Sequence, residues 1–196
     1  MSCTWTTIRQ ELGKLVERLR AAIAAPENTE KYTFLTVMSA VVYGTVFSYF
    51  TFLRHATFWS AAWDLGNFNQ AFYGTLFGGK IFYHTAEVFF SPSGCLFAIH
   101  VSPVLFLALP FYAIYPSPVT LLIIKSFAVG FAAVPLFLIA RKLLESDKAG
   151  FLVALVYLLY SPLQGAIWFD FQQAALFALF AFSAYFFLLK KSWKLY

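Results

Sequence analysis

Long runs of apolar residues alternate with short polar segments along most of this chain. The first run, from Thr33 to Leu53, has no charged residue, and a helix of about 20 apolar residues is enough to cross the hydrocarbon core of a bilayer. Further apolar runs follow in the second half of the sequence. The pattern predicts an all-α integral membrane protein. The later runs are Val101–Tyr115, Pro118–Ala140, Ala149–Ile167 and Ala174–Leu189.

The basic residues indicate which of these runs cross the membrane, because lysine and arginine gather on the cytoplasmic side. If Val101–Tyr115 crossed, two basic clusters would be placed outside. That run is shorter than the usual minimum of about 17 residues, and it contains Pro103 and Pro110. We therefore expect it to dip into the membrane from the outer side. About four transmembrane helices remain, at about 33–53, 118–140, 149–167 and 174–189.

This assignment predicts a multi-pass protein of the cell membrane with one large outer loop. The large loop covers residues 54–117, and a short second outer loop covers 168–173. Residues 1–31 are expected to be cytoplasmic, with an amphipathic helix over Thr6–Ala25 lying on the membrane surface. A poorly ordered basic tail is the alternative for that segment. Residues 32–196 would then form a single membrane domain.

The composition supports a membrane protein and argues against other classes. The chain is 61% hydrophobic and only 12% charged, whereas soluble domains have about 25% charged residues. The net charge of +5 comes mainly from the ends of apolar runs, where basic residues meet anionic lipid, so no nucleic-acid partner is expected. Cys3 and Cys95 are expected on opposite sides of the membrane, which argues against a disulfide. No nucleotide-binding loop, zinc signature or Ser-His-Asp arrangement is present in the sequence.

A polar segment, Trp63–Gln70, follows the first apolar run. Its Asp64 is followed by a glycine and by amides, of which Asn67 and Gln70 are candidates for contacting a substrate. At the membrane surface Asp64 could act as a general base, or stabilise a developing cation or a metal ion. The alternative is that Asp64 caps a helix running from about Leu65 to Phe77. The two roles are compatible.

Three further polar residues are candidates on the same side. Asp170 lies between the last two apolar runs, and it is either a second acid beside Asp64 or the N-cap of the last span. His100 stands at the mouth of the dipping segment, where it could bind a phosphate, relay a proton or ligate a metal, or serve the structure alone. Lys125 lies inside a predicted span, and intramembrane charges are functional candidates. It could neutralise a lipid phosphate, or its long stem could carry it to the surface.

Two other histidines have less specific signals. His84 and Glu87 are three residues apart, which would place them on one face of a helix as a pair of metal ligands. The sequence offers no third ligand with fixed spacing, so the metal requirement stays open. His55 follows the first apolar run and is interpreted as an interfacial anchor.

Several short segments occur together in an order typical of one family. They resemble the predicted membrane proteins of domain-of-unknown-function family 2079, over roughly residues 63–189. That family resembles the GT-C type of membrane glycosyltransferases, which take sugars from polyprenyl-phosphate donors on the outer face of the membrane. The segments are Asp64-Leu65-Gly66 with Gln70, His100-Val101-Ser102-Pro103, Tyr115-Pro116-Ser117-Pro118, Pro135 before Ala140-Arg141, Tyr157-Leu158 and Phe169-Asp170-Phe171.

The resemblance implies roles for the candidate residues. Those enzymes place a key aspartate in the first outer loop, so Asp64 would activate the acceptor or help to bind a divalent cation. Asp170 would be a second acid, and His100 and Lys125 would contact the donor phosphate. The sequence departs from the family after Phe-Asp-Phe, where His-Pro-Glu is replaced by Gln172-Gln173-Ala174.

These observations lead to three functional hypotheses. The first is a glycosyltransferase-like protein that is embedded in membrane lipid and uses a sugar linked to polyprenyl phosphate. The second is a noncatalytic subunit or remnant that packs against a partner membrane chain, since family members are usually longer and this chain is interpreted as truncated. The third, a transporter component, has the least support because no inverted repeat is visible.

Overall fold

Helices form nearly all of the ordered structure. The computed structural model describes residues 13–14, 28–86, 88–89 and 91–191. Within these residues there is no strand, and the only sheet-like pairing is an antiparallel bridge between Tyr83 and Cys95. The prediction of an all-α protein is confirmed. The amphipathic helix predicted over Thr6–Ala25 falls almost entirely outside the described residues.

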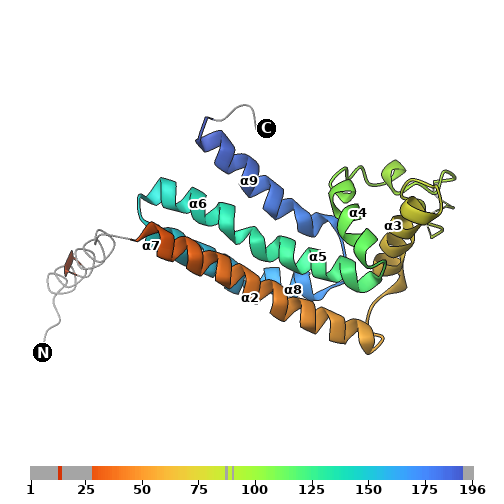
Figure 1. Cartoon of the computed structure of the whole chain (residues 1–196), viewed down its shortest axis with the longest axis horizontal. Helices are drawn as coiled ribbons and strands as arrows, with labels where there is room; N and C mark the ends of the chain where they lie inside the picture. Colours follow the sequence, from red (N-terminus) through yellow and green to blue (C-terminus); the bar gives the residue numbers. More distant parts are fainter. Residues whose placement is uncertain (1–12, 15–27, 87, 90, 192–196) are drawn as a thin grey trace, which may run out of the picture.

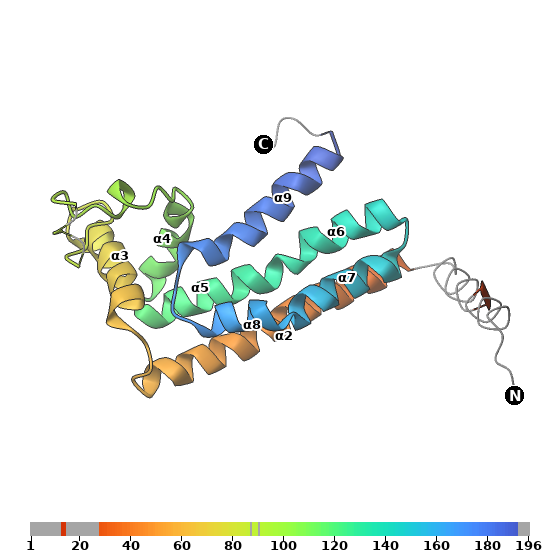
Figure 2. The same cartoon turned by 180° about the vertical axis from the view of Figure 1, so that it is seen from behind.

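A bundle of long helices carries a smaller helical layer across one of its ends (Figure 1). We call that end the α3–α4 end, and the opposite end, where α6 turns into α7, the basic end. Figure 2 shows α7 and α8 lying along α2 on the other side of the bundle. The bundle helices are α2 (Thr29–Ala56), α5 (Pro118–Phe131), α6 (Ala133–Leu144), α7 (Asp147–Leu159), α8 (Ser161–Trp168) and α9 (Phe177–Leu189). The other elements are η1 (Ala62–Gly66), α3 (Asn67–Phe77), η2 (Leu96–Ala98), α4 (Leu105–Ile114) and η3 (Gln173–Leu176).

The helix lengths only partly agree with the predicted spans. In the described part of the chain, α2 and the continuous segment Pro118–Leu144 are long and apolar enough to cross a membrane. The pair α7 and α8 would be a third span if its 48° bend is accepted. The segment Gln173–Leu189 and helix α4 are shorter apolar helices. The structure therefore supports two or three candidate spans, and the predicted count of four is not confirmed.

Prolines account for both breaks in the long helices. Pro135 has no N–H to donate to the carbonyl of Phe131, one turn earlier, and α5 gives way to α6 at Ala132 between them. Pro162 has no N–H to donate to the carbonyl of Leu158, one turn earlier, and the chain is extended at Tyr160, between α7 and α8. These two apolar runs are thus divided where a proline interrupts the hydrogen-bond ladder, whereas α2 is unbroken.

Small residues allow α2 and α5 to approach closely. A Cβ atom added to Gly130 would lie 2.7 Å from the carbonyl oxygen of Ala40. A Cβ atom added to Gly44 would lie 2.7 Å from the ring of Phe127. Contacts between small residues are a common means of packing helices in membranes, where backbone approach replaces the hydrophobic effect as a source of association.

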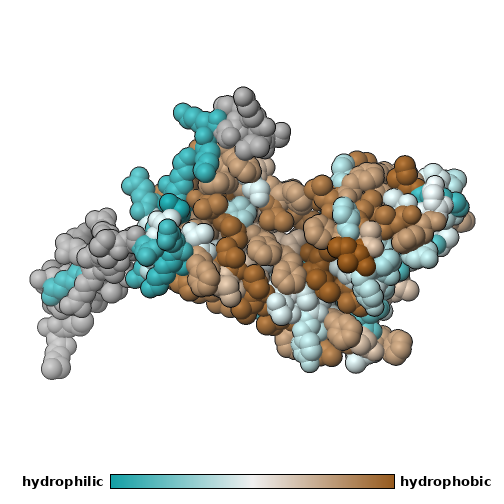
Figure 3. All heavy atoms as spheres, in the orientation of Figure 1, coloured by the Kyte–Doolittle hydropathy of each residue, from teal (hydrophilic) through white to brown (hydrophobic). Residues whose placement is uncertain are grey.

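The surface has an apolar belt between two polar ends (Figure 3). At the basic end, Asp147 accepts hydrogen bonds from the Arg141 guanidinium (2.7 Å) and from the Thr29 hydroxyl (2.6 Å). These contacts join the start of α2, the end of α6 and the start of α7. The ammonium group of Lys142 also donates to the carbonyl of Leu189, at the end of α9. The polar groups at this end therefore connect the helices to one another.

Aromatic side chains form the core at the α3–α4 end. Phe72 of α3 is fully buried and packs edge-to-face against Phe82, with the ring centroids 5.4 Å apart. It also contacts Tyr112 of α4 and Phe171 of the segment after α8, at centroid distances of 5.2 and 6.3 Å. Such pairs contribute beyond the area they bury. The short helices are therefore fixed to the bundle by one shared aromatic cluster.

Candidate functional site at the α3–α4 end

The carboxylate of Asp170 is completely buried and both of its oxygens are engaged. One oxygen lies 2.6 Å from Nη1 of Arg54, at the end of α2. The other accepts a hydrogen bond of 2.6 Å from the backbone N–H of Ala61. The alternative that Asp170 caps the last helical segment is wrong, because η3 begins at Gln173 and receives no side-chain cap. Asp170 instead connects the segment after α8 to α2.

Lys125 of α5 is also completely buried. Its ammonium group donates to the carbonyls of Ile167 (2.8 Å) and Asp170 (3.2 Å), and also to that of Phe169. The last carbonyls of a helix have no partner within the helix and attract cations, and α8 ends at Trp168. The alternative that Lys125 reaches the surface is therefore wrong, since the charge stays inside the protein against the end of α8.

Arg54 is the member of this group that the sequence did not single out. Its Nη1 donates to the carbonyl of Trp168 (3.3 Å) as well as to Asp170, and its guanidinium lies 5.7 Å from the ring centroid of Phe169. In the sequence it is one basic residue beside His55 at the end of an apolar run, which is an ordinary position for an anchor. The ring nitrogen Nδ1 of His55 lies 3.1 Å from the hydroxyl of Ser60.

Asp64 lies at the same end but in a more open setting. It belongs to the π-helical turn η1 and is half-buried. One of its oxygens accepts a hydrogen bond of 3.4 Å from the side-chain amide of Gln172, two residues after Asp170. The interpretation of Asp64 as a helix cap is wrong, because α3 begins at Asn67 and has no side-chain cap. The two acids predicted to face one side thus lie near each other, with different surroundings.

The amide residues have separate roles. The Gln70 side-chain oxygen accepts from both the backbone N–H (3.0 Å) and the hydroxyl (3.1 Å) of Thr85, and so holds the loop after α3. Asn67 begins α3 and is half-buried. The hydroxyl of Tyr112 donates to the side chain of Asn69 over 2.6 Å. Burial raises the pKa of Tyr112 to about 12, so this phenol keeps its proton in the ordinary pH range.

The histidines do not form a common centre with the two acids. His100 is exposed, on the segment leading to α4, and its backbone N–H donates to the carbonyl of Leu96. His84 is fully buried, on the loop after α3. Its predicted partner Glu87 lies outside the described residues, so the proposed ligand pair stays a prediction. Among the residues that the structure does describe, no group of three or more potential ligands is placed to hold a metal ion.

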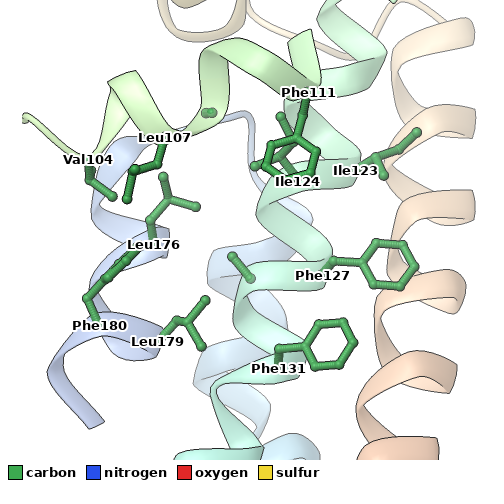
Figure 4. Close-up of a pocket in the computed structure, with 12 residues that line it drawn as sticks. Val104, Leu107, Phe111, Ile123, Ile124, Phe127, Phe131, Leu176, Leu179 and Phe180 are labelled. Carbon is green, nitrogen blue, oxygen red and sulfur yellow. The ribbon is translucent and has the colours of Figure 1, made fainter. Parts of the chain in front are cut away.

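An apolar groove runs between α4 and α9 (Figure 4). It consists of two adjoining cavities of about 400 Å³ and about 770 Å³, which share Val104, Leu107 and Phe180. The smaller cavity is lined by apolar side chains of α4, α5, η3 and α9. The larger one adds the polar side chains of Ser102 and Gln173, and we call this polar part the mouth of the groove. We call the two together the α4–α9 groove.

Neighbours along the chain connect the larger cavity to two of the candidate residues. Gln173 lines the larger cavity, and its neighbour Gln172 is the residue that donates to Asp64. His100 is two residues before Ser102, which lines the same cavity. Asp64, Gln172 and His100 are thus connected to the larger cavity through neighbouring residues and are not themselves among the residues that line it.

Comparison with known protein families identifies the chain. A family model described as predicted membrane protein (DUF2079) matches residues 54–196. The chain belongs to this family. No curated protein and no solved structure matches it, so the comparisons add no evidence for the resemblance to GT-C glycosyltransferases.

The matched region of this DUF2079 protein begins at Arg54 and contains every residue of the site. The family therefore covers both the buried group around Asp170 and the groove. Within it, Asp64 has a half-open position from which a carboxylate can accept a proton or attract a cation. Asp170 and Lys125 have no such freedom, because their polar atoms are occupied by the protein itself.

Proposed function

We propose that this protein binds a sugar carried on polyprenyl phosphate and takes part in transfer of that sugar at the outer face of the membrane. The hydrocarbon chain would occupy the α4–α9 groove, and the head group would lie at its mouth, beside Asp64. The proposal is supported by an apolar groove whose lining residue Gln173 directly follows Gln172, the hydrogen-bond partner of the half-buried Asp64. Ligand sites are commonly apolar cavities with a few polar groups that fix orientation.

The orientation follows from the distribution of charge. Arg141, Lys142 and Lys148 lie at the basic end, and Lys190 follows the end of α9 near it. Basic residues favour the cytoplasmic side of membrane helices, so the α3–α4 end would face outward. The groove would then open toward the outer leaflet, where a lipid-linked donor can enter sideways.

The residues at the mouth would have distinct roles. Asp64 would accept the proton of the acceptor hydroxyl, or hold a divalent cation that neutralises the phosphate. His100 would contact the phosphate, with Asn67 near the sugar. Asp170 and Lys125 would support the site without touching the substrate, because their polar atoms are already engaged. Of the four titratable candidates, this assignment leaves only Asp64 and His100 in contact with the substrate.

Binding can be tested with a variant that fills the mouth of the groove. Ala174 is exposed and lines the larger cavity, so Ala174→Trp would block it without disturbing the core. Ala113 of α4 is also exposed but lies outside the lining, so Ala113→Trp is the matched control. Native mass spectrometry of each protein in phosphatidylcholine nanodiscs, with added polyprenyl phosphate, should show the lipid on wild type and control only. Equal retention by Ala174→Trp would overturn the proposal.

A noncatalytic subunit is the second candidate. It is favoured by one observation, namely that only Asp64 of the two predicted acids is open to a substrate. This candidate keeps the lipid groove but assigns the chemistry to a partner membrane chain. It predicts that Asp64→Asn leaves sugar transfer unchanged in membranes that contain both chains. The first candidate predicts that the same variant abolishes sugar transfer.

A further inference from the structure

Residues 167–170, which are the last two residues of α8 and the two that follow it, are held by three donors from elsewhere in the chain, two side chains and one backbone N–H. Lys125 donates to the carbonyls of Ile167, Phe169 and Asp170, and Arg54 donates to the carbonyl of Trp168 and to the carboxylate of Asp170. The backbone of Ala61 donates to the second carboxylate oxygen. We call residues 167–170 the α8–η3 link.

This link leads directly into one wall of the groove. Gln173 and Ala174 line the larger cavity, while Leu176, Leu179 and Phe180 line the smaller one. Much of α9 beyond the link is exposed, including Phe177, Phe180 and Tyr185. In Figure 1, α9 diverges from α5 on its way to the basic end. The direction of α9 is therefore set by the link at its start and by the hydrogen bond from Lys142 to the carbonyl of Leu189 at its end.

The arrangement also explains why two cations are placed beside one acid. Lys125 and Arg54 both face the carbonyls at the end of α8, where the helix dipole is negative. Asp170 adds a full negative charge against Arg54 at 2.6 Å. Unpaired charges are costly away from water, and both cations here have partners from the protein. A substrate phosphate is not needed to explain the burial of Lys125.

We infer that Arg54, Lys125 and Asp170 are positioning residues that fix the α8–η3 link and thereby set the width of the α4–α9 groove. They act through the backbone of the link and not by touching a ligand. The consequence for lipid binding rests on the proposed function; the consequence for the position of α9 does not. A wall that is held in place before the lipid arrives need not be ordered on binding, which favours affinity.

The position of α9 can be measured without any ligand. Spin labels would be placed at Met38 of α2 and Tyr185 of α9, both exposed, after Cys3 and Cys95 are replaced by serine. A second pair, Met38 and Leu152 of α7, reports on the bundle itself, since Leu152 is also exposed. Distances would be measured by pulsed electron paramagnetic resonance in phosphatidylcholine nanodiscs.

Lys125→Met removes the ammonium donors and keeps a side chain of similar length. Lys80→Met is the matched control, because Lys80 is an exposed lysine at the α3–α4 end. We expect Lys125→Met to shift or broaden the 38–185 distance while leaving 38–152 unchanged, and Lys125→Arg to restore it in part. Arg54→Gln, at a position nearer the surface, should have the same effect if Lys125→Met does not fold. An unchanged 38–185 distance in the folded variants, or equal changes in both pairs, would overturn the inference.

The same variants separate this inference from the proposed function. If the wall is loosened, binding of polyprenyl phosphate should weaken roughly tenfold, because the lipid must then order α9. Unchanged binding despite a shifted 38–185 distance would overturn the link to the groove. Failure of wild type to bind polyprenyl phosphate, with the distance shift observed, would contradict the proposed function alone.

Discussion

Arg54 and Asp170 form an ion pair of 2.6 Å that joins the end of α2 to the segment after α8, with the carboxylate fully shielded from solvent. The two residues are 116 positions apart in the chain. Their pairing closes the bundle at the α3–α4 end, in the way that Arg141 and Asp147 close it at the basic end. The contrast between these two pairs leads to the first prediction.

Asp170→Asn should destabilise the protein far more than Asp147→Asn. Breaking a buried pair leaves a charge without its partner and costs about 3–5 kcal/mol. We expect the lower end for Asp170→Asn, because the Arg54 side chain retains 15% exposure. The Arg141 side chain is 38% exposed, so loss of its partner should cost about 1 kcal/mol or less. Reversible unfolding in mixed micelles would measure both, and similar losses for the two variants would contradict this ranking.

The second prediction concerns the close approach of α2 and α5. Gly130→Ala would bring a Cβ atom to 2.7 Å from the Ala40 carbonyl, which is backbone and cannot rotate away. Separating the helices should cost about 1–3 kcal/mol, as overpacking usually does. Gly165→Ala in α8 is the control, because nothing lies within 4 Å of its added Cβ. That variant should be neutral or slightly stabilising, since alanine favours the helix.

The same unfolding assay checks both glycine variants. If Gly130→Ala were as stable as Gly165→Ala, the approach of α2 to α5 would have to be looser than the 2.7 Å separation implies. The comparison is informative because both glycines lie in helices, so differences in helix propensity cancel.

The third prediction tests the orientation of the bundle. Lys80, in the loop after α3, and Glu145, between α6 and α7, are both exposed and lie at opposite ends. In a background with Cys3 and Cys95 replaced by serine, a membrane-impermeant maleimide added to intact cells should label Lys80→Cys and spare Glu145→Cys. Glu145→Cys should react once the cells are broken. Labelling of Glu145→Cys in intact cells would reverse the proposed orientation and place the groove mouth inside.

The sequence predicted the helical class and the ends of several helices, because those features depend on local composition. The end of α3 at Phe77 agrees with the glycines after it, and the short apolar run predicted a short segment where α4 lies, although Pro110 is inside that helix. The starts of helices were less predictable. An acid before an apolar run suggested a cap at Asp64, but a π-helical turn placed it inside the helix entry.

The buried group was only partly visible in the sequence. Asp170 and Lys125 stood out because charges near apolar runs are rare. Their partners did not, since Lys125 binds backbone carbonyls, which no side-chain pattern reveals, and Arg54 was one basic residue among several at helix ends. The groove was also hidden, because α4 and α9 are separated by the whole of α5 to α8 and meet only in the folded chain.

The last prediction separates the two acids by what each does. Asp64 is half-buried and accepts one hydrogen bond from Gln172 of 3.4 Å, so Asp64→Asn should cost about 1 kcal/mol or less, as loss of a weak hydrogen bond does. If Asp64 accepts a proton from the acceptor or holds a cation, the same variant should abolish sugar transfer, because an amide does neither well. Asp170→Asn should show the reverse pattern, with a large loss of stability and a smaller loss of sugar transfer. Transfer assays with proteoliposomes of equal folded protein would measure this, and an active Asp64→Asn would move the chemistry to a partner chain.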